Sequence, residues 1–555
     1  MNDMSTGTLE FLPLGGVGEI GMNLALYGYH HDGRKNWIVV DFGLSFPGDK
    51  HPGVEVIYPD IDFLIEHRDE IEAILITHAH EDHYGAIGAL WGQIRKPLFM
   101  TPFAAGLLEA KGRAPEGLDV TIVQPGDVTD HGPFSVEWVA VTHSIPEPCS
   151  LAITTPVGLV MHTGDWKLDP DPVVGLVTDQ SRFEQIGEAG VLALICDSTN
   201  AIREGRSPGE SDVKADLQRF IDEATGRVAV TMFSSNVARI RTVIEAAAKA
   251  EREVVVVGRA LRRAIEVARS VGYLDGLPLL LDEEAFGYMP RDKVLALCTG
   301  SQGEARAALA KIAANDHHQV TLNRGDRVIF SSRTIPGNEK SVSGIINDLI
   351  DQGIEVITDN DGLVHVSGHP RRDELSDMYR WIKPAIAVPV HGEAMHLAAH
   401  ANLARDIGVD TVVEARNGTI VQLHPAPASI VGHVETGIWL QDGKLILPDG
   451  QSGTKERRKL AFVGVVTVAV VLNAHGEQLA PADFELIGLP EVAENGDSFD
   501  DIIGNAIDGT LASIPRKRRR DAVKVEEAIG RAVRAAVRDR WGKKPFCSVL
   551  VTRID

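Results

Sequence analysis

Short, largely apolar runs separated by polar turn residues recur along roughly the first 200 residues of the chain. Such runs predict β-strands, and turn signals such as His31-Asp-Gly33 separate them. Helix-period stretches are fewer in this part, so the pattern predicts a sheet-rich sandwich with covering helices. The predicted strands lie near residues 9–14, 24–29, 37–41, 73–77, 136–141, 151–155 and 192–197.

After about residue 205, strand-like runs begin to alternate with helical stretches. This order is typical of a parallel, doubly wound sheet, in which each strand is followed by a helix. The strands are expected at residues 227–232, 253–257, 293–297, 327–330 and 355–357, with helices among them at 237–250 and 302–313. A strand at 385–390 and a helix at 393–405 then precede another strand-rich piece.

Glycine and proline are dense in residues 424–458, which predicts loops and a linker. A last unit follows, with strands near 460–472, 484–488 and 546–553 and helices near 498–513 and 521–541. This mixture of strands and helices predicts a small α+β unit.

The composition fits a large globular protein. The chain has 555 residues, of which 44% are hydrophobic, and this length suggests about three domains that can each bury a core. Charged residues make up 24%, which excludes wholesale disorder. The formal charge is 55 − 78 = −23, so the chain should repel nucleic acid unless its charge is unevenly placed or offset by metal.

The cysteines and the apolar runs bear on the cellular compartment. Four cysteines, Cys149, Cys196, Cys298 and Cys547, lie far apart without any C-x-x-C pair. This excludes a disulfide scaffold and a thiolate zinc site, and it fits a reducing cytoplasm. The first residues lack the features of a signal peptide, and the longest apolar run, 460–472, has 13 residues against the about 20 of a membrane helix. We therefore expect a cytoplasmic protein without a membrane span.

One motif suggests a nucleotide cofactor and is rejected by its context. Gly16-Val-Gly-Glu-Ile-Gly21 matches G-x-G-x-x-G, and Asp41 lies 20 residues after Gly21. The dinucleotide fingerprint requires a helix between the glycines and the next strand. Residues 23–40 instead alternate with period two on either side of a turn. We therefore predict a β-hairpin after a tight glycine loop, and no nucleotide cofactor.

The strongest chemical signal is His78-Ala-His80-Glu-Asp82-His83, directly after a predicted strand. Four potential ligands in six residues cannot share one side of a strand or helix, but a loop can aim them at two neighbouring points. His78 and His80 can bind one ion while Asp82 and His83 bind a second. Neutral imidazole and carboxylate suit zinc, and also manganese.

These residues alone do not give either ion a full set of ligands, so further ligands must come from elsewhere in the chain. Candidates at predicted strand ends are His143, Asp165 and His391, and the two oxygens of Asp165 could bridge both ions. Asp41, which closes another strand, is better placed as a carboxylate that orients a ligand histidine. An ordinary structural role for the whole 78–83 cluster is disfavoured, because buried ligand-type side chains without metal would stay unsatisfied.

The gap between Asp165 and His391 is 391 − 165 = 226 residues, enough for an inserted domain. Polar residues follow three of its predicted strands: Ser234, Ser235 and Asn236 after the first, residues 299–304 after the third, and Ser332 after the fourth. The carboxyl ends of parallel strands line a ligand crevice, where helix N-termini present N–H groups to anions. These residues predict a phosphate site; the alternative is that they cap the helices that follow.

The H-x-H-x-D-H motif with His143 and Asp165 resembles the metallo-β-lactamase superfamily. The resemblance implies an α/β protein with an αββα sandwich and two divalent ions per chain at the strand ends, zinc being expected first and manganese second. It assigns one ion to His78, His80, His143 and Asp165, and the other to Asp82, His83, Asp165 and His391. Members of this superfamily hydrolyse lactams, thioesters, lactones or phosphodiesters.

Further motifs resemble the ribonuclease J family, in the β-CASP subgroup of this superfamily. They are residues 14–23, Asp197 in C-D-S-T, the 299–304 motif, residues 335–339, His369 in S-G-H-P and the small C-terminal unit. The resemblance implies RNA maturation and mRNA decay on single-stranded RNA, by a 5′-to-3′ exonuclease that prefers a 5′-monophosphate and also cuts internally. Its implied catalytic residues are Asp82, Asp197, which orients a histidine, and His369, which contacts the scissile phosphate. Ser367, Gly368 and His369 would join the phosphate pocket.

The same resemblance implies how the chain is divided. Residues 1–204 and 363–425 would form a metallo-β-lactamase domain in two parts, and residues 205–362 the inserted, doubly wound β-CASP domain. A linker at 426–458 would lead to a C-terminal α+β domain at 459–555. That last domain is expected to form a homodimer or homotetramer.

The C-terminal unit carries a local excess of positive charge. From Arg516 to Asp555 the balance is 13 − 5 = +8, and the densest run, residues 516–520, precedes an amphipathic helix. Two interpretations remain open. The run is an RNA-contacting edge, or it is a solvated helix start beside an oligomer interface.

Two rival functions are compatible with parts of the pattern. A metal-dependent hydrolase of a small ester, lactone or thioester would use the same ligands without the long insertion. A non-catalytic RNA-binding scaffold would need no complete ligand set, and the sequence has one.

Overall fold

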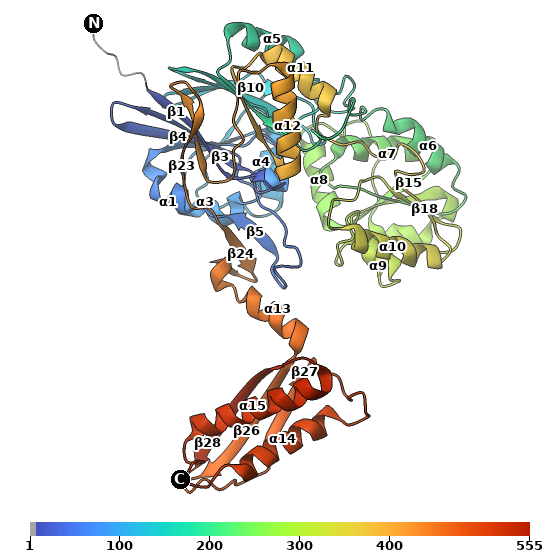
Figure 1. Ribbon diagram of the computed structural model, residues 1–555. Coiled ribbons are helices and arrows are strands. Elements are labelled where there is room, and N and C mark those ends of the chain that lie inside the picture. Colours follow the sequence, from blue (N-terminus) through green and yellow to red (C-terminus); the bar gives the residue numbers. More distant parts are fainter. Residues whose placement is uncertain (1–6, 555) are drawn as a thin grey trace. The chain divides into compact units, whose positions relative to one another are not determined.

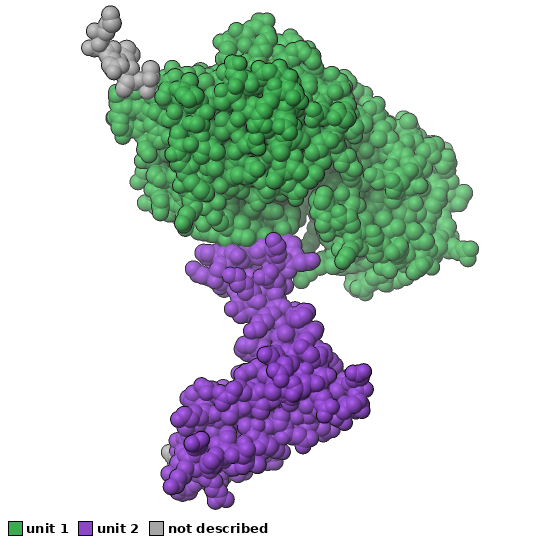
Figure 2. Space-filling model, viewed as in Figure 1, with its two compact units in different colours: residues 1–46, 56–439 green, residues 47–55, 440–555 purple. Residues whose placement is uncertain are grey.

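The computed structural model describes residues 7–554, and the chain folds as two compact units (Figure 2). The first extends to residue 46 and continues over residues 56–439. The second consists of residues 47–55 and the chain from residue 440 onward. Each unit is described by itself.

Two sheets packed face to face form the larger part of the first unit (Figure 1). One sheet contains, in order, β23 (Ser429–His433), β22 (Thr419–His424), β1 (Thr8–Gly15), β3 (Leu24–His31), β4 (Arg34–Val40), β6 (Ile71–Leu75), β7 (Leu98–Met100) and β8 (Val120–Ile122). The other contains β21 (Thr411–Val412), β19 (Ile386–Val390), β13 (Ala193–Asp197), β12 (Gly158–His162), β11 (Cys149–Thr155), β10 (Phe134–Ala140) and β9 (Val128–His131).

Helices cover the outer faces of both sheets. Side chains from the inner faces of the two sheets, among them Phe11, Tyr27 and Trp138, make one continuous core. A second core lies between the outer face of the β9–β21 sheet and the helices α5 (Gln180–Ala189), α11 (Arg372–Ile382) and α12 (Ala394–Ile407). On the other side lie α1 (Asp62–Glu66), α3 (Ile87–Ile94) and α4 (Pro102–Ala110) (Figure 1). The expected αββα sandwich is confirmed.

The glycine-rich motif near the N-terminus leads into a hairpin and not into a helix. β3 and β4 pair antiparallel across a two-residue turn. Asp32 and Gly33 in that turn have φ values of 49° and 75°, as a type I′ turn requires. The motif therefore lacks the helix on which a dinucleotide site depends.

The inserted part of the first unit is a five-stranded parallel sheet, as the alternating pattern predicts. Its order is β15 (Glu253–Val257), β16 (Val294–Cys298), β14 (Val228–Thr231), β17 (Arg327–Phe330) and β18 (Glu355–Ile357). Its helices are α6 (Val213–Asp222), α7 (Val237–Lys249), α8 (Arg259–Ser270), α9 (Ala308–Ala313) and α10 (Glu339–Asp351). Strands buried on both faces and flanking helices confirm the doubly wound sheet.

The helix predicted at residues 302–313 is about half as long as expected. Only Ala308–Ala313 is helical, because Gly300 and Gly303 before it have φ values of 114° and 77°. A β-carbon on Gly303 would lie 2.6 Å from the Ser341 β-carbon. A left-handed turn that passes close to α10 therefore takes the place of the first helical turns.

The second unit ends in an α+β domain with a one-sided sheet, as expected. Its sheet order is β27 (Asp483–Ile487), β26 (Val465–Asn473) and β28 (Phe546–Ile554). Alternate residues of β26 are buried against α14 (Phe499–Ser513) and α15 (Ala522–Trp541). The basic run 516–520 forms turns before α15, where Arg516 pairs with Glu477 at 3.1 Å and Arg519 Nε donates to the Ile514 carbonyl at 2.8 Å.

The prediction of loops across residues 424–458 is wrong. Those residues contain β23, β24 (Ile438–Asp442) and β25 (Leu445–Pro448), because most of the glycines and prolines lie between these strands. The strand expected to begin at residue 460 begins at Val465, since α13 (Thr454–Val463) occupies the preceding residues and ends at Gly464, whose φ is 67°. Within residues 7–554 there is no helix with both the length and the apolar character needed to cross a bilayer.

Candidate metal centre

The predicted ligands meet at one edge of the sandwich because they all follow carboxyl ends of strands. Strands β10, β12, β13 and β19 run in the same direction, and β6 contributes from the facing sheet. The side chains that follow these ends are His78, His80, Asp82 and His83 after β6, His143 after β10, Asp165 after β12, Asp197 at the end of β13 and His391 after β19.

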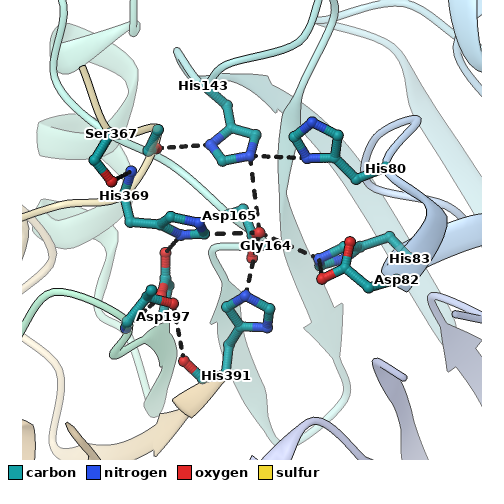
Figure 3. A network of polar contacts seen from close by, with 12 residues as sticks. His80, Asp82, His83, His143, Gly164, Asp165, Asp197, Ser367, His369 and His391 are labelled. Atoms are coloured by element: carbon teal, nitrogen blue, oxygen red, sulfur yellow. Dashed lines mark hydrogen bonds and ion pairs between the residues drawn. The ribbon is translucent and has the colours of Figure 1, made fainter. Parts of the chain in front are cut away.

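These residues form two groups of four that share Asp165. One consists of His78, His80, His143 and Asp165, and the other of Asp82, His83, Asp165 and His391, with the ligand atoms of each group within 4.8 Å of one another. Asp165 Oδ2 lies 3.3 Å from the Nε2 atoms of both His83 and His391 (Figure 3). It lies 3.8 Å from His143 Nε2 and 3.9 Å from His78 Nε2. One carboxylate therefore faces both groups.

The donor set fits two divalent ions. Asp165 Oδ1 is buried without a hydrogen-bond partner among the described residues, an arrangement that is costly unless a ligand satisfies it. Burial lowers the pKa of His78 and His143 well below the usual value, and that of His80 to about 4. These imidazoles are therefore neutral and keep a lone pair for a metal.

The carboxylates create a field that favours positive charge at the centre. Burial opposes the charged form of His83, but Asp165, Asp41 and Asp82 outweigh burial and raise the pKa of His83 well above its usual value. Burial likewise opposes the charge of Asp165, yet His391 and His83 hold the pKa of this carboxyl well below its usual value. A site that stabilises cations to this degree is suited to divalent ions.

Hydrogen bonds fix the orientation of three ligand rings. His83 Nδ1 donates to Asp41 Oδ2 at 2.7 Å, as His143 Nδ1 does to the Gly368 carbonyl at 2.6 Å. His391 Nδ1 donates to Asn23 Oδ1 at 2.8 Å. Each contact is made through Nδ1 and leaves Nε2 turned toward the ligand groups.

Asn23 and Thr77 contact the candidate ligands or their partner Asp41, and the sequence did not single them out for this. Besides its bond to His391, Asn23 Nδ2 lies 2.9 Å from His83 Nε2. The Thr77 amide and hydroxyl both donate to Asp41, at 2.8–3.0 Å, and so fix that carboxylate. The only available signal was that Asn23 closes the glycine motif directly before β3, and that signal does not reveal a partner.

His369 lies beside the two ligand groups and is held by Asp197. Asp197 Oδ2 accepts from His369 Nδ1 at 2.7 Å, and the His369 ring stacks on His391 with centroids 5.5 Å apart (Figure 3). Burial opposes the charge of His369, but Asp197 and Asp165 outweigh burial and raise its pKa to about 9. His369 therefore presents a positive charge, and its Nε2–H remains available as a donor.

The predicted phosphate-binding residues belong to segments that reach residues 364–369 through neighbouring side chains. Ser234 and Ser235 follow β14 and are partly exposed, and the neighbouring Phe233 ring lies 6.2 Å from that of His365. Asn200 Nδ2 donates to Ser367 Oγ at 2.9 Å and to the His369 carbonyl at 3.1 Å.

Two of the other predicted pocket residues make hydrogen bonds within the protein. Asn236 Oδ1 caps α7 by accepting from the Arg239 amide at 2.9 Å, the alternative considered for these residues. Gly368 uses its carbonyl to orient His143. Ser332 is buried at the end of β17.

Family models match four parts of the chain. Residues 29–259 match the metallo-beta-lactamase superfamily, and residues 225–349 match the ribonuclease J beta-CASP domain. Residues 353–414 match the Zn-dependent metallo-hydrolase RNA specificity domain, and residues 454–554 match the ribonuclease J C-terminal domain.

Whole-length relatives agree with these models. A ribonuclease J of Sinorhizobium meliloti is 52% identical over 549 residues, which cover 98% of this chain and 97% of the relative. A ribonuclease J of Mycolicibacterium smegmatis is 38% identical and covers 99% and 98% of the two chains. A solved structure from Enterococcus faecalis V583, a protein of unknown function, covers 75% of this chain with a TM-score of 0.52 at 17% identity, a likeness of fold alone.

Proposed function

This chain belongs to the ribonuclease J family, and from that premise we propose that it is a metal-dependent ribonuclease that degrades single-stranded RNA from the 5′ end and also cuts internally. The observation that carries the proposal is the pair of ligand groups that share Asp165 beside the His369–Asp197 pair. A hydrolase of a small ester, lactone or thioester has less support, because models of the β-CASP and RNA specificity domains both match.

The proposed metal ligands are the seven residues of the two groups, with zinc as the proposed ion and manganese as the second choice. Two bound divalent ions would supply Lewis acidity for a phosphoryl oxygen and a water with a lowered pKa. The protein's own contribution is the fixed orientation of the ligands, through Asp41, Asn23 and the Gly368 carbonyl.

His369 and Asp197 provide the general acid of the proposed reaction. When water attacks the phosphorus, the bond from phosphorus to the 3′ oxygen of the leaving nucleotide breaks, and that oxygen needs a proton. Asp197 holds His369 Nδ1 and favours the charged ring, so Nε2–H can donate this proton. The product then carries the 5′-phosphate.

A pocket for the 5′-phosphate is proposed from Ser234, Ser235, Ser367 and His369. Asn200 fixes the last two in place, and hydroxyls with one imidazolium offer a fixed number of donors. Such a pocket suits a monophosphate, whereas a triphosphate adds bulk and charge. One charge-assisted hydrogen bond contributes about 1.5–3 kcal/mol, or about 10- to 100-fold in rate.

Exonucleolytic decay should be fastest on 5′-monophosphate RNA and at least about tenfold slower on 5′-triphosphate RNA. Single-turnover rates on two RNAs that differ only at the end group measure this preference. The Ser234→Leu/Ser235→Leu variant should lose the preference but keep internal cleavage, while Ser270→Leu, at an exposed serine of α8, should keep both. Equal wild-type rates on the two RNAs would reject the pocket.

A homodimer or homotetramer through the C-terminal sheet is also proposed. One face of this sheet packs on α14 and α15, but the opposite face exposes Ile487, Phe546, Leu550 and Ile554. Register places Leu550 opposite Ala469 and Phe546 opposite Val465, so the apolar residues of β26 and β28 share that face. A second copy of this chain, with the same face, would cover this apolar surface.

Leu550→Glu should reduce the molar mass in solution to that of one chain. A charge in the centre of this face would have to be buried on association, which is costly. Leu279→Glu is the matched control, since Leu279 is 79% exposed on the inserted domain and Leu550 is 66% exposed. Light scattering that gives the same mass for Leu550→Glu and the wild type would contradict this interface.

A further inference from the structure

A cluster of cations surrounds Glu81, the neighbour of the ligand Asp82. Lys111 Nζ donates to Glu81 Oε1 at 2.6 Å, and Arg113 Nη1 lies 3.9 Å from Glu81 Oε2. Burial lowers the pKa of Lys111, and the nearby charges of Arg113 and Arg263 lower it further against the effect of Glu81. Lys111 and Arg113 therefore share one carboxylate, with Arg263 close enough to Lys111 to act on its charge, a local balance of 3 − 1 = +2 in a chain with a net charge of −23.

Arg113 and Arg263 both have N–H groups that donate to no carboxylate. The Arg113 side chain is 50% exposed beside the loop that carries the metal ligands. Arg263 Nε, on α8, is buried and has no hydrogen-bond partner within residues 7–554, and the charge of Arg263 acts on Lys111. A buried donor without an acceptor is unfavourable, and a phosphate oxygen is a strong acceptor for a guanidinium.

An exposed aromatic side chain lies at the same end of the metal centre. The Leu44 amide donates to the Glu81 carbonyl at 3.0 Å, and the β-carbon position of Gly21 lies 3.3 Å from Ser45 Oγ and 3.7 Å from the Asp82 β-carbon. Phe46, the next residue, is 65% exposed. A single exposed phenylalanine is ordinary on a protein surface, but this one directly follows Leu44 and Ser45, which lie beside the loop of Glu81 and Asp82.

The two ends of the metal centre differ in what they offer to RNA. In Figure 3, Asp82 and His83 lie on one side of Asp165, while Ser367, His369 and Asp197 lie on the other. When the 5′ nucleotide occupies the Ser367–His369 side, the rest of the strand must leave on the Asp82 side. That is the side of Glu81, Arg113 and Phe46.

We propose that Phe46, Arg113 and Arg263 form a subsite for the RNA beyond the first nucleotide on the 3′ side of the scissile phosphate, in which the arginines bind backbone phosphates and a base stacks on Phe46. This inference rests on the proposed 5′-end function. Single-stranded nucleic acid is held in the same way elsewhere, by cations along the backbone and aromatic rings under the bases, without selection of sequence. Lys111 is occupied by Glu81 and positions the cluster instead of contacting RNA.

The test compares kcat/KM on a 5′-monophosphorylated diadenylate with that on longer oligoadenylates, using the metal-loaded enzyme. In Phe46→Ala, the ratio of kcat/KM on long RNA to kcat/KM on the diadenylate should fall about 5- to 100-fold, which is the effect of losing one stacked base. In Arg113→Gln the same ratio should fall, and the slope of log KM against log salt should shrink by about 0.7 for each phosphate that the variant no longer neutralises. Arg113→Lys should keep most of the wild-type slope, because the charge remains.

Matched controls come from exposed residues of the same type elsewhere in the first unit. Tyr288→Ala removes a ring that is 92% exposed, and Arg68→Gln removes a guanidinium whose side chain is 59% exposed. Both controls should keep the wild-type dependence on length and salt.

Wild-type length and salt dependence in both Phe46→Ala and Arg113→Gln would overturn the subsite. An equal fall of kcat/KM on the dinucleotide and on long RNA would also overturn the subsite, since it would show that these residues act in the cleavage step. Failure of the proposed 5′ pocket would be seen in a different experiment, as equal wild-type rates on 5′-monophosphate and 5′-triphosphate RNA. The length comparison does not depend on that pocket, because all of its RNAs have the same 5′-monophosphate end.

Discussion

Replacement of Asp165 by alanine should abolish RNA cleavage and reduce the metal content to less than two ions per chain. Asp165 belongs to both ligand groups, and its Oδ2 atom lies within 3.9 Å of one imidazole nitrogen of each of His78, His83, His143 and His391. No other side chain belongs to both groups of four. We expect the rate to fall at least about 10⁴-fold, or about 5 kcal/mol at about 1.36 kcal/mol for each tenfold change. Elemental analysis of gel-filtered protein and single-turnover cleavage measure the two effects.

Asp165→Asn separates loss of the charge from loss of the side chain's volume. It should lose metal and activity to a similar degree while keeping the shape of the buried side chain, so the near-ultraviolet circular dichroism should stay that of the wild type. Asp171→Ala removes an exposed carboxylate six residues away and should change nothing. Full metal content and a wild-type rate in Asp165→Ala would contradict the two-group site.

Gly368→Ala should cost at least about 100-fold in rate although no ligand is replaced, as expected for a displacement of about 1 Å at a catalytic centre. A β-carbon on Gly368 would lie 2.6 Å from His143 Cε1 and 2.7 Å from His143 Nδ1. Either the ring or the 367–369 loop must move, and the hydrogen bond from His143 to the Gly368 carbonyl then breaks. Removal of such an outer hydrogen bond lowers metal affinity about 10- to 100-fold. Competition with a coloured zinc chelator measures that affinity.

Gly344→Ala is the matched control for this substitution. Gly344 lies exposed within α10, and its β-carbon position meets no atom within 4 Å. Alanine in the middle of a helix stabilises it by up to about 1 kcal/mol relative to glycine. The control should therefore bind metal and cleave RNA like the wild type. A Gly368→Ala protein with wild-type metal affinity would show that the His143 contact is dispensable.

The sequence identified the candidate metal ligands because short local motifs contain them. His78, His80, Asp82 and His83 are adjacent in the chain, and Asp165 and His391 each follow an apolar strand, so their common edge follows from strand direction. The residues that orient these ligands carry no such signal. Asn23 contacts His391 across 368 positions of sequence, and Gly368 contacts His143 across 225. Only the folded chain brings such partners together.

The architecture was predictable wherever periodicity ran uninterrupted. The five parallel strands of the inserted domain have the expected places to within a few residues, and β26 ends where it was expected. Short edge strands such as β23 and β25 were missed, because they lie among glycines and prolines and bury little apolar surface to give a pattern. The start of β26 was misplaced because apolar residues of α13 run directly into the valines of the strand.

Titration of metal into chelator-stripped protein with a 5′-end-labelled, 5′-monophosphate RNA tests the proposed reaction most directly. Because two ligand groups share Asp165, activity should return in proportion to zinc or manganese and saturate near two ions per chain. The first labelled product should be a mononucleotide. Full cleavage in the presence of the chelator would contradict the metal centre, and a ladder that shortens from the 3′ end would contradict the direction of attack.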